Sequence, residues 1–481
     1  MSGNDGKTSR KLKLWEALAL SLGLMGPTLA MGGNGQGLID SVGKAIPLVF
    51  VFGLAGVALI AYGFIRLTRY YNHAGSAYAL VGATVGARAG FFSGFALLGT
   101  YVFFSICTLA ALGAFANALL AALQHGADKP YQLPWIVPAL AGALLSVYFS
   151  TRDTRTISKV LLLVEGIGIV FMIILTATIF AKGGAPTTHV DFSSFSLDGV
   201  GFQAVAAAVV AAFLSWAGFE GCATLGEETD DPKRNIPLAL LGSVVLTGAL
   251  FVIVMFAQTI GFGTDAAGLA AFKGSGNTLG ALAETYLGRP VALILIFSAV
   301  LAAFGSHLSS VATASRLLFA LSRDGFGPRI LGALDSRHGQ PRNAVWVVLA
   351  VTAIVDLIAY LTGRPNIGTG DLAIDAYFHF AIIGSVCLMV VYLMVEVGVT
   401  RLILSGQVAI PKWELVIPVL GMAVIVTALY FNLVGPFDPF AAPVLALGWC
   451  VLGLLVTLCA PSMVRSIGNR LAGELGAPSK S

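Results

Sequence analysis

The sequence predicts an all-α membrane protein that crosses the bilayer many times. Of its 481 residues, 57% are hydrophobic and only 11% are charged, whereas soluble globular chains carry about 25% charged residues. This composition excludes disorder and argues against a large soluble enzyme. The net charge of +4 is small and scattered, so we expect no nucleic-acid partner. The five cysteines form no metal-ligand or disulfide pattern.

Twelve apolar stretches are long enough to cross a bilayer. They lack the period-two alternation of a β-barrel, and the lipid core offers the backbone no hydrogen-bond partners, so we expect helices. The first stretch is longer than a signal-peptide core and has no clear cleavage site, so we expect it to be retained. The predicted spans are 15–39, 44–66, 88–122, 132–151, 157–181, 200–226, 236–262, 289–320, 343–362, 373–400, 412–432 and 440–462.

Positive charge orients these spans. If the N-terminus is cytoplasmic, the outside loops hold only six of the 28 Lys and Arg residues, so both termini are expected to face the cytoplasm and the chain to lie in the cytoplasmic membrane. The six are Lys44, Lys129, Lys182, Lys273, Arg289 and Arg364. The outside segments 182–199 and 263–288 are expected to lie on the surface with short helices. Asn235 is expected to cap the seventh span, with Pro237 in its first turn.

Two spans contain residues that interrupt a helix. The first holds Gly26-Pro27-Thr28 and a glycine-rich run that includes Gly32, and the sixth holds Gly218-Phe219-Glu220. Breaks in the first and sixth spans indicate a five-helix unit that is repeated with inverted topology, which predicts a secondary-transporter site near the membrane midplane. The alternative interpretation is that the glycines serve close helix packing.

The repeat divides the chain into segments. They are a cytoplasmic segment 1–14, a first five-helix repeat 15–181, an extracellular connection 182–199, a second repeat 200–400, two further helices in 412–462 and a cytoplasmic tail 463–481. Because one chain encloses a complete five-plus-five core, a monomer is sufficient, and nothing decides between a monomer and a weak homodimer.

Four segments resemble the amino acid–polyamine–organocation permease superfamily over nearly the whole chain. They are YYNHAGSAY (70–78); GFEG (218–221) with GEET (226–229) and DPKRNIP (231–237); ASRLLFA (314–320) with RDG (323–325) and Pro328; and PRNA (341–344). The resemblance implies a LeuT-like fold of twelve helices, with helices 1 and 6 broken and two extra C-terminal helices. It also implies import of amino acids or related amines by alternating access, without a cofactor.

Eight residues are candidates for substrate binding: seven at or near the two breaks, and Tyr101 in the third span, which we expect to reach the same cavity. They are Gly26, Pro27, Thr28, Gly32, Tyr101, Trp216, Gly218 and Phe219. Many family members carry G-S-G or G-A-G in the first broken helix, where it holds the substrate carboxylate. Pro27 departs from that pattern because proline cannot donate a backbone hydrogen bond, so an amine substrate stays open. The aromatic residues have packing as their alternative role.

The candidates for ion coupling are Glu220, Glu165 and His307. A carboxyl group inside the membrane is costly unless it faces protein or water, and a proton is the expected coupling ion, with sodium as the alternative. Each of the two carboxylates has a structural hydrogen-bonding role as its alternative. Four residues are candidates for an inner gate, or else for anchors that obey the positive-inside rule: Arg316, Arg323, Asp324 and Arg342.

The sequence contains no ATP-binding P-loop and no recognisable hydrolase, metalloprotease or dinucleotide motif. We therefore expect a permease rather than an enzyme. The alternatives are an amine or polyamine carrier, an amino-acid exchanger and, more remotely, a transporter-like sensor without flux.

Overall fold

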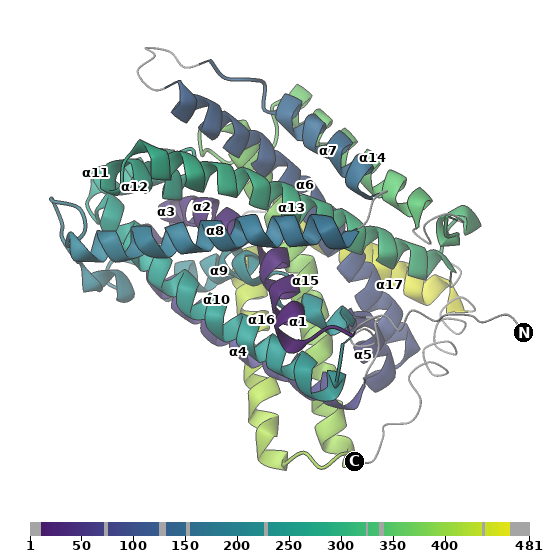
Figure 1. Ribbon diagram of the computed structural model, residues 1–481. Coiled ribbons are helices and arrows are strands. Elements are labelled where there is room, and N and C mark those ends of the chain that lie inside the picture. Colours follow the sequence, from purple (N-terminus) through teal and green to yellow (C-terminus); the bar gives the residue numbers. More distant parts are fainter. Residues whose placement is uncertain are drawn as a thin grey trace, which may run out of the picture.

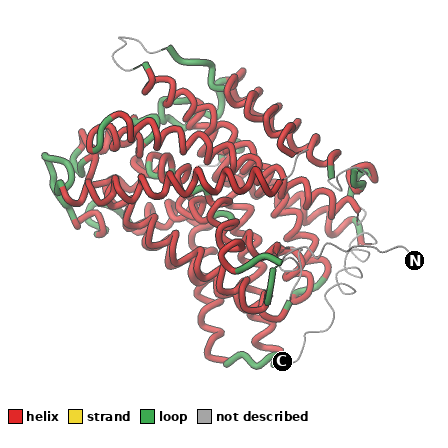
Figure 2. Tube along the Cα trace, viewed as in Figure 1, coloured by secondary structure: helices red, strands yellow, loops and turns green. Residues whose placement is uncertain are grey.

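The computed structural model describes residues 11–71, 76–124, 131–150, 154–225, 229–323, 326–335, 341–434 and 438–461. This part of the chain is helical and contains no strand, apart from one isolated bridge between Leu12 and Thr229 (Figure 2). The first half comprises α1 (Leu14–Met25), α2 (Pro27–Gly33), η1 (Gln36–Leu38), α3 (Ile39–Val42), η2 (Gly43–Ala45), α4 (Ile46–Tyr70), α5 (Ser76–Thr84), α6 (Ala87–Leu123), α7 (Ile136–Ser150), α8 (Thr154–Ala181) and η3 (Phe192–Phe195).

The second half begins with another interrupted helix and ends with two shorter ones. It comprises α9 (Phe202–Phe213), η4 (Leu214–Trp216), η5 (Phe219–Leu225), α10 (Pro232–Phe262), α11 (Ala266–Gly274), α12 (Thr278–Tyr286), α13 (Arg289–Arg323), η6 (Arg329–Gly332), α14 (Arg342–Thr362), α15 (Leu372–Ser405), η7 (Lys412–Leu415), α16 (Val416–Leu433) and α17 (Ala442–Cys459). Each of the twelve predicted stretches therefore contains at least one helix.

Nine helical segments within the described ranges are long and apolar enough to cross a membrane. Three shorter apolar helices fall in the predicted fourth, fifth and sixth spans: Ile136–Phe149, Glu165–Ala181 and Phe202–Trp216. The last of these comprises α9 and the 3₁₀ turn η4, and it is short because the backbone leaves the helical conformation at Ala217 and Gly218. The architecture agrees with the predicted polytopic membrane protein.

Helix α6 lies at the centre of the packing. Its most extensive contacts are with α13 and α15, while α4 packs mainly along α10 (Figure 1). Helix α1 ends in the middle of the molecule and contacts α10, α13 and η5, so the first break is enclosed by helices that lie far away in the sequence. Glycines permit some of these close approaches; for example, a Cβ at Gly384 of α15 would lie 2.6 Å from the ring of Phe104.

The loops gather at two ends of the bundle. At the first, called here the α12 end, Lys182 Nζ donates to the Tyr286 carbonyl at 2.9 Å and Lys44 Nζ lies 3.3 Å from Asp191. At the opposite end, called the N-terminal end, the Asp230 N–H donates to the Leu12 carbonyl at 2.9 Å. This contact joins the segment before α1 to the segment after η5.

Two expectations about these loops are wrong. Helix α10 begins at Pro232, with Asp231 as its N-cap, because proline suits the first helical position. Asn235 therefore lies inside the helix, where its amide donates to the Asp230 carbonyl at 2.5 Å instead of capping. Segment 263–288 is not confined to the surface, because Leu279, Leu282 and most of the rest of α12 are buried against α2, α8 and α13.

Candidate transport site at two helix breaks

The first interruption lies at Gly26, between α1 and α2. Gly26 has a φ of +55°, a left-handed conformation that costs a residue with a side chain about 1–2 kcal/mol. Pro27 then opens α2, where its fixed φ is favourable and its missing N–H is not needed. A Cβ at Gly26 would lie 2.7 Å from the hydroxyl oxygen of Ser306. The first span is therefore broken near its predicted position, with α13 close beside the break.

The backbone N–H of Thr28 is already occupied by a carboxylate of the protein itself. Thr28 donates to Glu165 Oε1 through its N–H at 2.6 Å and through its hydroxyl at 2.7 Å. Glu165 is buried and comes from α8, which approaches closely because Gly168 leaves room for Thr28. In the present conformation Thr28 therefore cannot offer this N–H to a substrate carboxylate. Its side chain binds the candidate coupling residue instead.

The second interruption follows η4, at Ala217 and Gly218. Gly218 has a φ of +100°, a conformation that only glycine adopts readily. A Cβ there would lie 3.0 Å from the Cβ of Leu24 in α1. The Ser21 hydroxyl donates to the Phe219 carbonyl at 3.0 Å and accepts from the Cys222 N–H at 3.1 Å. The two broken segments therefore lie side by side, and Ser21 supplies hydrogen bonds where the sixth span has lost its α-helical pattern.

Glu220 lies just beyond the second break and is held by two tyrosines. Tyr392 donates its hydroxyl to Glu220 Oε2 at 3.0 Å, and Tyr101 donates more weakly to Oε1 at 3.4 Å. All three side chains are buried. Phe219 covers this group from the side, with its ring 5.7 Å from that of Tyr392 and 5.6 Å from that of Phe64. No local sequence pattern indicates this arrangement, because Glu220, Tyr101 and Tyr392 come from three separate spans.

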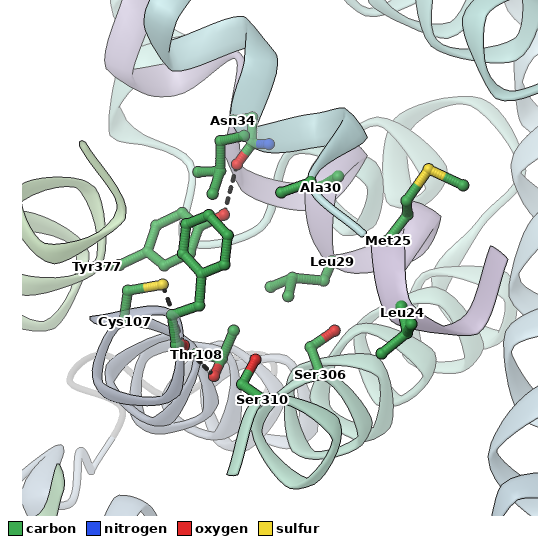
Figure 3. A pocket seen from close by; sticks show the side chains of 13 residues that line it. Leu24, Met25, Leu29, Ala30, Asn34, Cys107, Thr108, Ser306, Ser310 and Tyr377 are labelled. Atoms are coloured by element: carbon green, nitrogen blue, oxygen red, sulfur yellow. Dashed lines mark hydrogen bonds between the residues drawn. The ribbon is translucent and has the colours of Figure 1, made fainter. Parts of the chain in front are cut away.

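A small cavity of about 40 Å³ lies between the two breaks (Figure 3). This volume admits about three water molecules. None of the described residues that line the cavity is Asp, Glu, Lys or Arg. They are Leu24, Met25, Leu29, Ala30, Asn34, Phe104, Cys107, Thr108, Leu214, Ala217, Ser306, Ser310 and Tyr377.

Polar side chains close the cavity toward the α12 end. Tyr377 donates to Asn34 Oδ1 at 2.5 Å, and the amide nitrogen of Asn34 donates to the Ser215 hydroxyl at 2.7 Å, which joins α15, the end of α2 and η4. Gln258 and Thr278 both donate to the Met31 carbonyl, at 2.8 and 2.9 Å. The N-terminal half of α12 therefore participates directly in closing this end.

None of the eight predicted substrate residues is among the residues that line the cavity. Gly26 and Gly218 each follow a lining residue in the sequence, Met25 and Ala217, while Tyr101 and Phe219 lie beside Glu220 and Tyr392. Gly32 lies against Asn277, near the entry to α12. Trp216 packs between Phe50 and Phe251, with ring separations of 5.6 and 5.4 Å.

The residues that do line the cavity are not among the candidates predicted from the sequence. Phe104, Cys107 and Thr108 share one face of α6, and Ser306 and Ser310 are one turn apart on α13. The pair of serines at helical spacing was the available signal, because small hydroxyl residues stand out in an apolar span. The direction in which they point required the tertiary structure.

The remaining candidates lie outside the cavity. His307 Nδ1 is 2.9 Å from the Ser105 carbonyl, which ties α13 to α6, and its Nε2 has no partner among the described residues. Arg316 and Arg342 are exposed at the N-terminal end, and the Arg323 guanidinium lies 5.7 Å from the ring centre of Phe319. Asp324 and the family-like loop residues 72–75 lie outside the described residues.

A second small cavity, also of about 40 Å³, lies on the far side of α1 beside Glu165. Its lining combines this carboxylate, a serine hydroxyl and apolar groups from α1, α8 and α13: Leu20, Gly23, Leu24, Leu162, Glu165, Leu301, Ala302, Gly305 and Ser309. Glu165 therefore lies between Thr28 at the first break and a second cavity whose lining is mostly apolar.

The chain matches the model of the family described as "Amino acid permease" over residues 17–458. It is 24% identical over 365 residues to the branched-chain amino acid permease BcaP of Lactococcus lactis subsp. cremoris (strain MG1363), which covers 73% of this chain and 76% of that protein. It is 21% identical over 343 residues to the low-affinity putrescine importer PlaP of Escherichia coli (strain K12), covering 70% and 73%. An uncharacterized transporter of Mycobacterium tuberculosis (strain ATCC 25618 / H37Rv) is 27% identical over 380 residues, covering 77% and 79%.

The match to the family model spans both helix breaks and the helices that line the cavity. These matches point to a transporter rather than an enzyme, and the apolar helices place it in a membrane. The chain belongs to the amino acid permease family of the amino acid–polyamine–organocation superfamily.

Proposed function

We propose that this protein is a secondary active permease that imports amino acids or related amines across the cytoplasmic membrane by alternating access. The observation that carries the proposal is the cavity between two adjacent helix breaks. Broken helices free backbone groups at the midplane of a transporter, where they bind substrate. The named relatives BcaP and PlaP move substrates of these two classes, which supports the same range here.

The proposed architecture is twelve membrane helices in a LeuT-like five-plus-five inverted repeat. The segment α1–α2 and the segment α9–η5 are the equivalent broken helices of the two units, and α16 and α17 follow as extra helices. The positive-inside rule then makes the α12 end extracellular and places both termini in the cytoplasm. Alternating access consists of rocking the bundle of spans 1, 2, 6 and 7 against the rest.

In this assignment the structure represents a closed conformation. The 40 Å³ cavity is too small for an amino acid. On the extracellular side Asn34 is hydrogen-bonded to Tyr377 of α15, and the Met31 carbonyl to Thr278 of α12. Substrate entry therefore requires that α2 separate from α12 and α15. At the opposite, N-terminal end, the contact between Leu12 and Asp230 would move with the bundle, because it joins the segments that flank spans 1 and 6.

The proposed coupling ion is the proton, with Glu165 and Glu220 as its carriers. Both carboxylates are buried beside a helix break, and both bind groups that must move when the site opens: Thr28 for Glu165, and two tyrosines for Glu220. A carboxyl group crosses a low-dielectric core far more easily in its neutral form. Protonation would also release Thr28 from the charge-assisted bonds that hold it to α8.

The decisive experiment is substrate uptake into proteoliposomes with an imposed inward proton gradient. Wild-type protein should accumulate substrate, and the collapse of the gradient should abolish accumulation. Glu165→Gln or Glu220→Gln should lose the gradient dependence while retaining exchange of internal for external substrate. Glu396→Gln is a matched control, because Glu396 is also buried and packs against Gly63 and Gly421, but its carboxyl oxygens have no hydrogen-bond partner among the described residues.

The outcomes separate the alternatives. Gradient-driven uptake that persists in both Glu165→Gln and Glu220→Gln contradicts the assigned carriers. Uptake that depends on a sodium gradient instead of a proton gradient would make sodium the coupling ion. Obligatory exchange that needs neither gradient would make the protein an exchanger. Binding without any flux in wild-type protein would favour the sensor and end the permease proposal.

A further inference from the structure

We infer that this site selects neutral amino acids with small apolar side chains over diamines and polyamines, and that Ser306 and Ser310 bind the polar end of the substrate. The inference rests on the proposed function, because it concerns the cargo of the cavity between the helix breaks. It follows from the hydrogen bonding, the charge and the shape of the cavity wall.

Ser306 supplies a buried hydroxyl without a partner. The residue is 5% exposed, and its Oγ has no hydrogen-bond partner among the described residues. Leaving a buried hydroxyl unpaired costs about 1–3 kcal/mol, which a bound ligand can offset. The oxygen lies beside Gly26, and Ser310 follows one turn later on the same face of α13, so both hydroxyl groups lie along one wall of the cavity (Figure 3).

The other polar groups of the wall are already used. Asn34 accepts from Tyr377 and donates to Ser215, and the Thr108 hydroxyl donates to the Phe104 carbonyl at 2.6 Å. Thr28, the donor expected from the family pattern, points to Glu165 on the opposite side of α2. The serines of α13 are therefore the side chains best placed to replace the lost carboxylate contact.

The cavity offers no formal negative charge to a cationic substrate. None of the described lining residues is charged, Glu165 faces a different cavity, and Glu220 is bound by Tyr101 and Tyr392. Burying an ammonium group without a compensating charge is very costly, and a diamine brings two. A zwitterionic amino acid has no net charge, and the carbonyl end of α1, beside Leu24 and Met25, offers acceptors for its single ammonium group.

The rest of the wall suits a small apolar side chain. Leu29 and Ala30 from α2, Phe104 from α6, and Leu214 and Ala217 from the second break are apolar and face the same space. A charged side chain would find no partner there, and a large aromatic one would need far more displacement of the wall than a small aliphatic one. Alanine, valine, leucine and isoleucine are the expected class.

The first test is a thermal-shift and competition series on the detergent-purified full chain. Leucine and valine should stabilise the protein and compete for uptake at concentrations at least tenfold lower than putrescine, cadaverine or lysine. Putrescine that competes as well as leucine would overturn the inference while leaving the permease proposal intact. If none of these amines and amino acids binds or is transported, the permease proposal itself fails.

The second test replaces the hydroxyl group directly. Ser306→Ala should raise the KM for leucine about tenfold, the effect of losing one hydrogen bond to a charged group, with a smaller change in maximal rate. Ser315→Ala is the matched control, since Ser315 is buried on the same helix but donates to its own helix at the Val311 carbonyl, 2.6 Å away. An unchanged KM in Ser306→Ala, or an equal rise in both variants, would show that the serine does not bind substrate.

Discussion

At the scale of single residues, Asp191 illustrates a carboxylate that stabilises a loop through several donors at once. The Ser193 hydroxyl donates to it at 2.6 Å, Thr264 at 2.8 Å, and Lys44 lies at 3.3 Å. Hydrogen bonds from Ser193, and then from Thr264, hold the pKa of this carboxyl below its ordinary value against the opposing effect of burial. The residue connects the loop before α9 with η2 and with the segment that follows α10.

A pH-dependent loss of stability follows from that contact. Because the folded-state pKa of Asp191 is lowered, its stabilising contribution is complete well above the ordinary pKa of about 4 and is lost as the pH falls through the folded-state value. Asp191→Asn should lower the free energy of unfolding by about 1–2 kcal/mol at pH 7, and the difference from wild type should shrink toward pH 3. Thermal melting of the wild type and of Asp191→Asn between pH 7 and pH 3 tests this prediction. Asp198→Asn in the same loop is the control. A difference that does not change with pH would contradict the charge-based explanation.

At the scale of secondary structure, the two helix breaks depend on glycine for different reasons. Gly26 needs a left-handed backbone and lies against Ser306, while Gly218 needs a more restricted conformation and lies against Leu24. Local backbone preference and close packing therefore act together at each break. Repacking of the neighbouring side chains alone could therefore not accommodate a larger residue at either position.

Substitution of these glycines should impair both folding and transport. Gly218→Ala should destabilise the protein by about 1–2 kcal/mol or more and reduce uptake, and Gly26→Ala should do the same because its new methyl group also displaces Ser306. Gly448→Ala is the matched control, since this glycine lies in α17 with open space around it, where alanine is neutral or slightly favourable. Detergent melting curves and uptake rates provide the measurement; wild-type values in Gly218→Ala would refute the explanation.

At the scale of the whole molecule, closure of the α12 end depends on contacts between segments that the proposed mechanism moves apart. Asn34 at the end of α2 accepts a hydrogen bond from Tyr377 of α15, and the Met31 carbonyl of α2 accepts one from Thr278 of α12. Both donors lie outside the proposed moving bundle. If rocking of the bundle opens this end, weakening these bonds should shift the population of conformations without changing the composition of the site.

Tyr377→Phe should therefore expose the cavity from the α12 end. The loss of one buried hydrogen bond, about 1 kcal/mol, corresponds to roughly a fivefold shift in a two-state equilibrium. A cysteine introduced as Ala30→Cys should react severalfold faster with an impermeant maleimide added from that side. Tyr430→Phe, at an exposed position on α16, should leave the labelling rate unchanged. Slower labelling in Tyr377→Phe would mean that this network does not hold the site closed.

The sequence by itself determined the membrane class, the helical stretches and the two breaks. Hydrophobicity over about twenty residues and the backbone properties of Gly26, Pro27 and Gly218 are local, so they can be recognised without knowing any distant contact. It also indicated Glu165 and Glu220, because a carboxylate in an apolar span is rare.

The tertiary structure alone decided what these residues touch. Thr28 is separated from Glu165 by 137 positions and Tyr377 from Asn34 by 343, and no local pattern encodes such pairs. Packing also placed Trp216 between two phenylalanines instead of in the cavity, inserted α12 over α2, and turned Ser306 and Ser310 toward the site. The physical reason is that helix formation depends on local sequence, whereas the direction of a side chain depends on how distant helices pack around it.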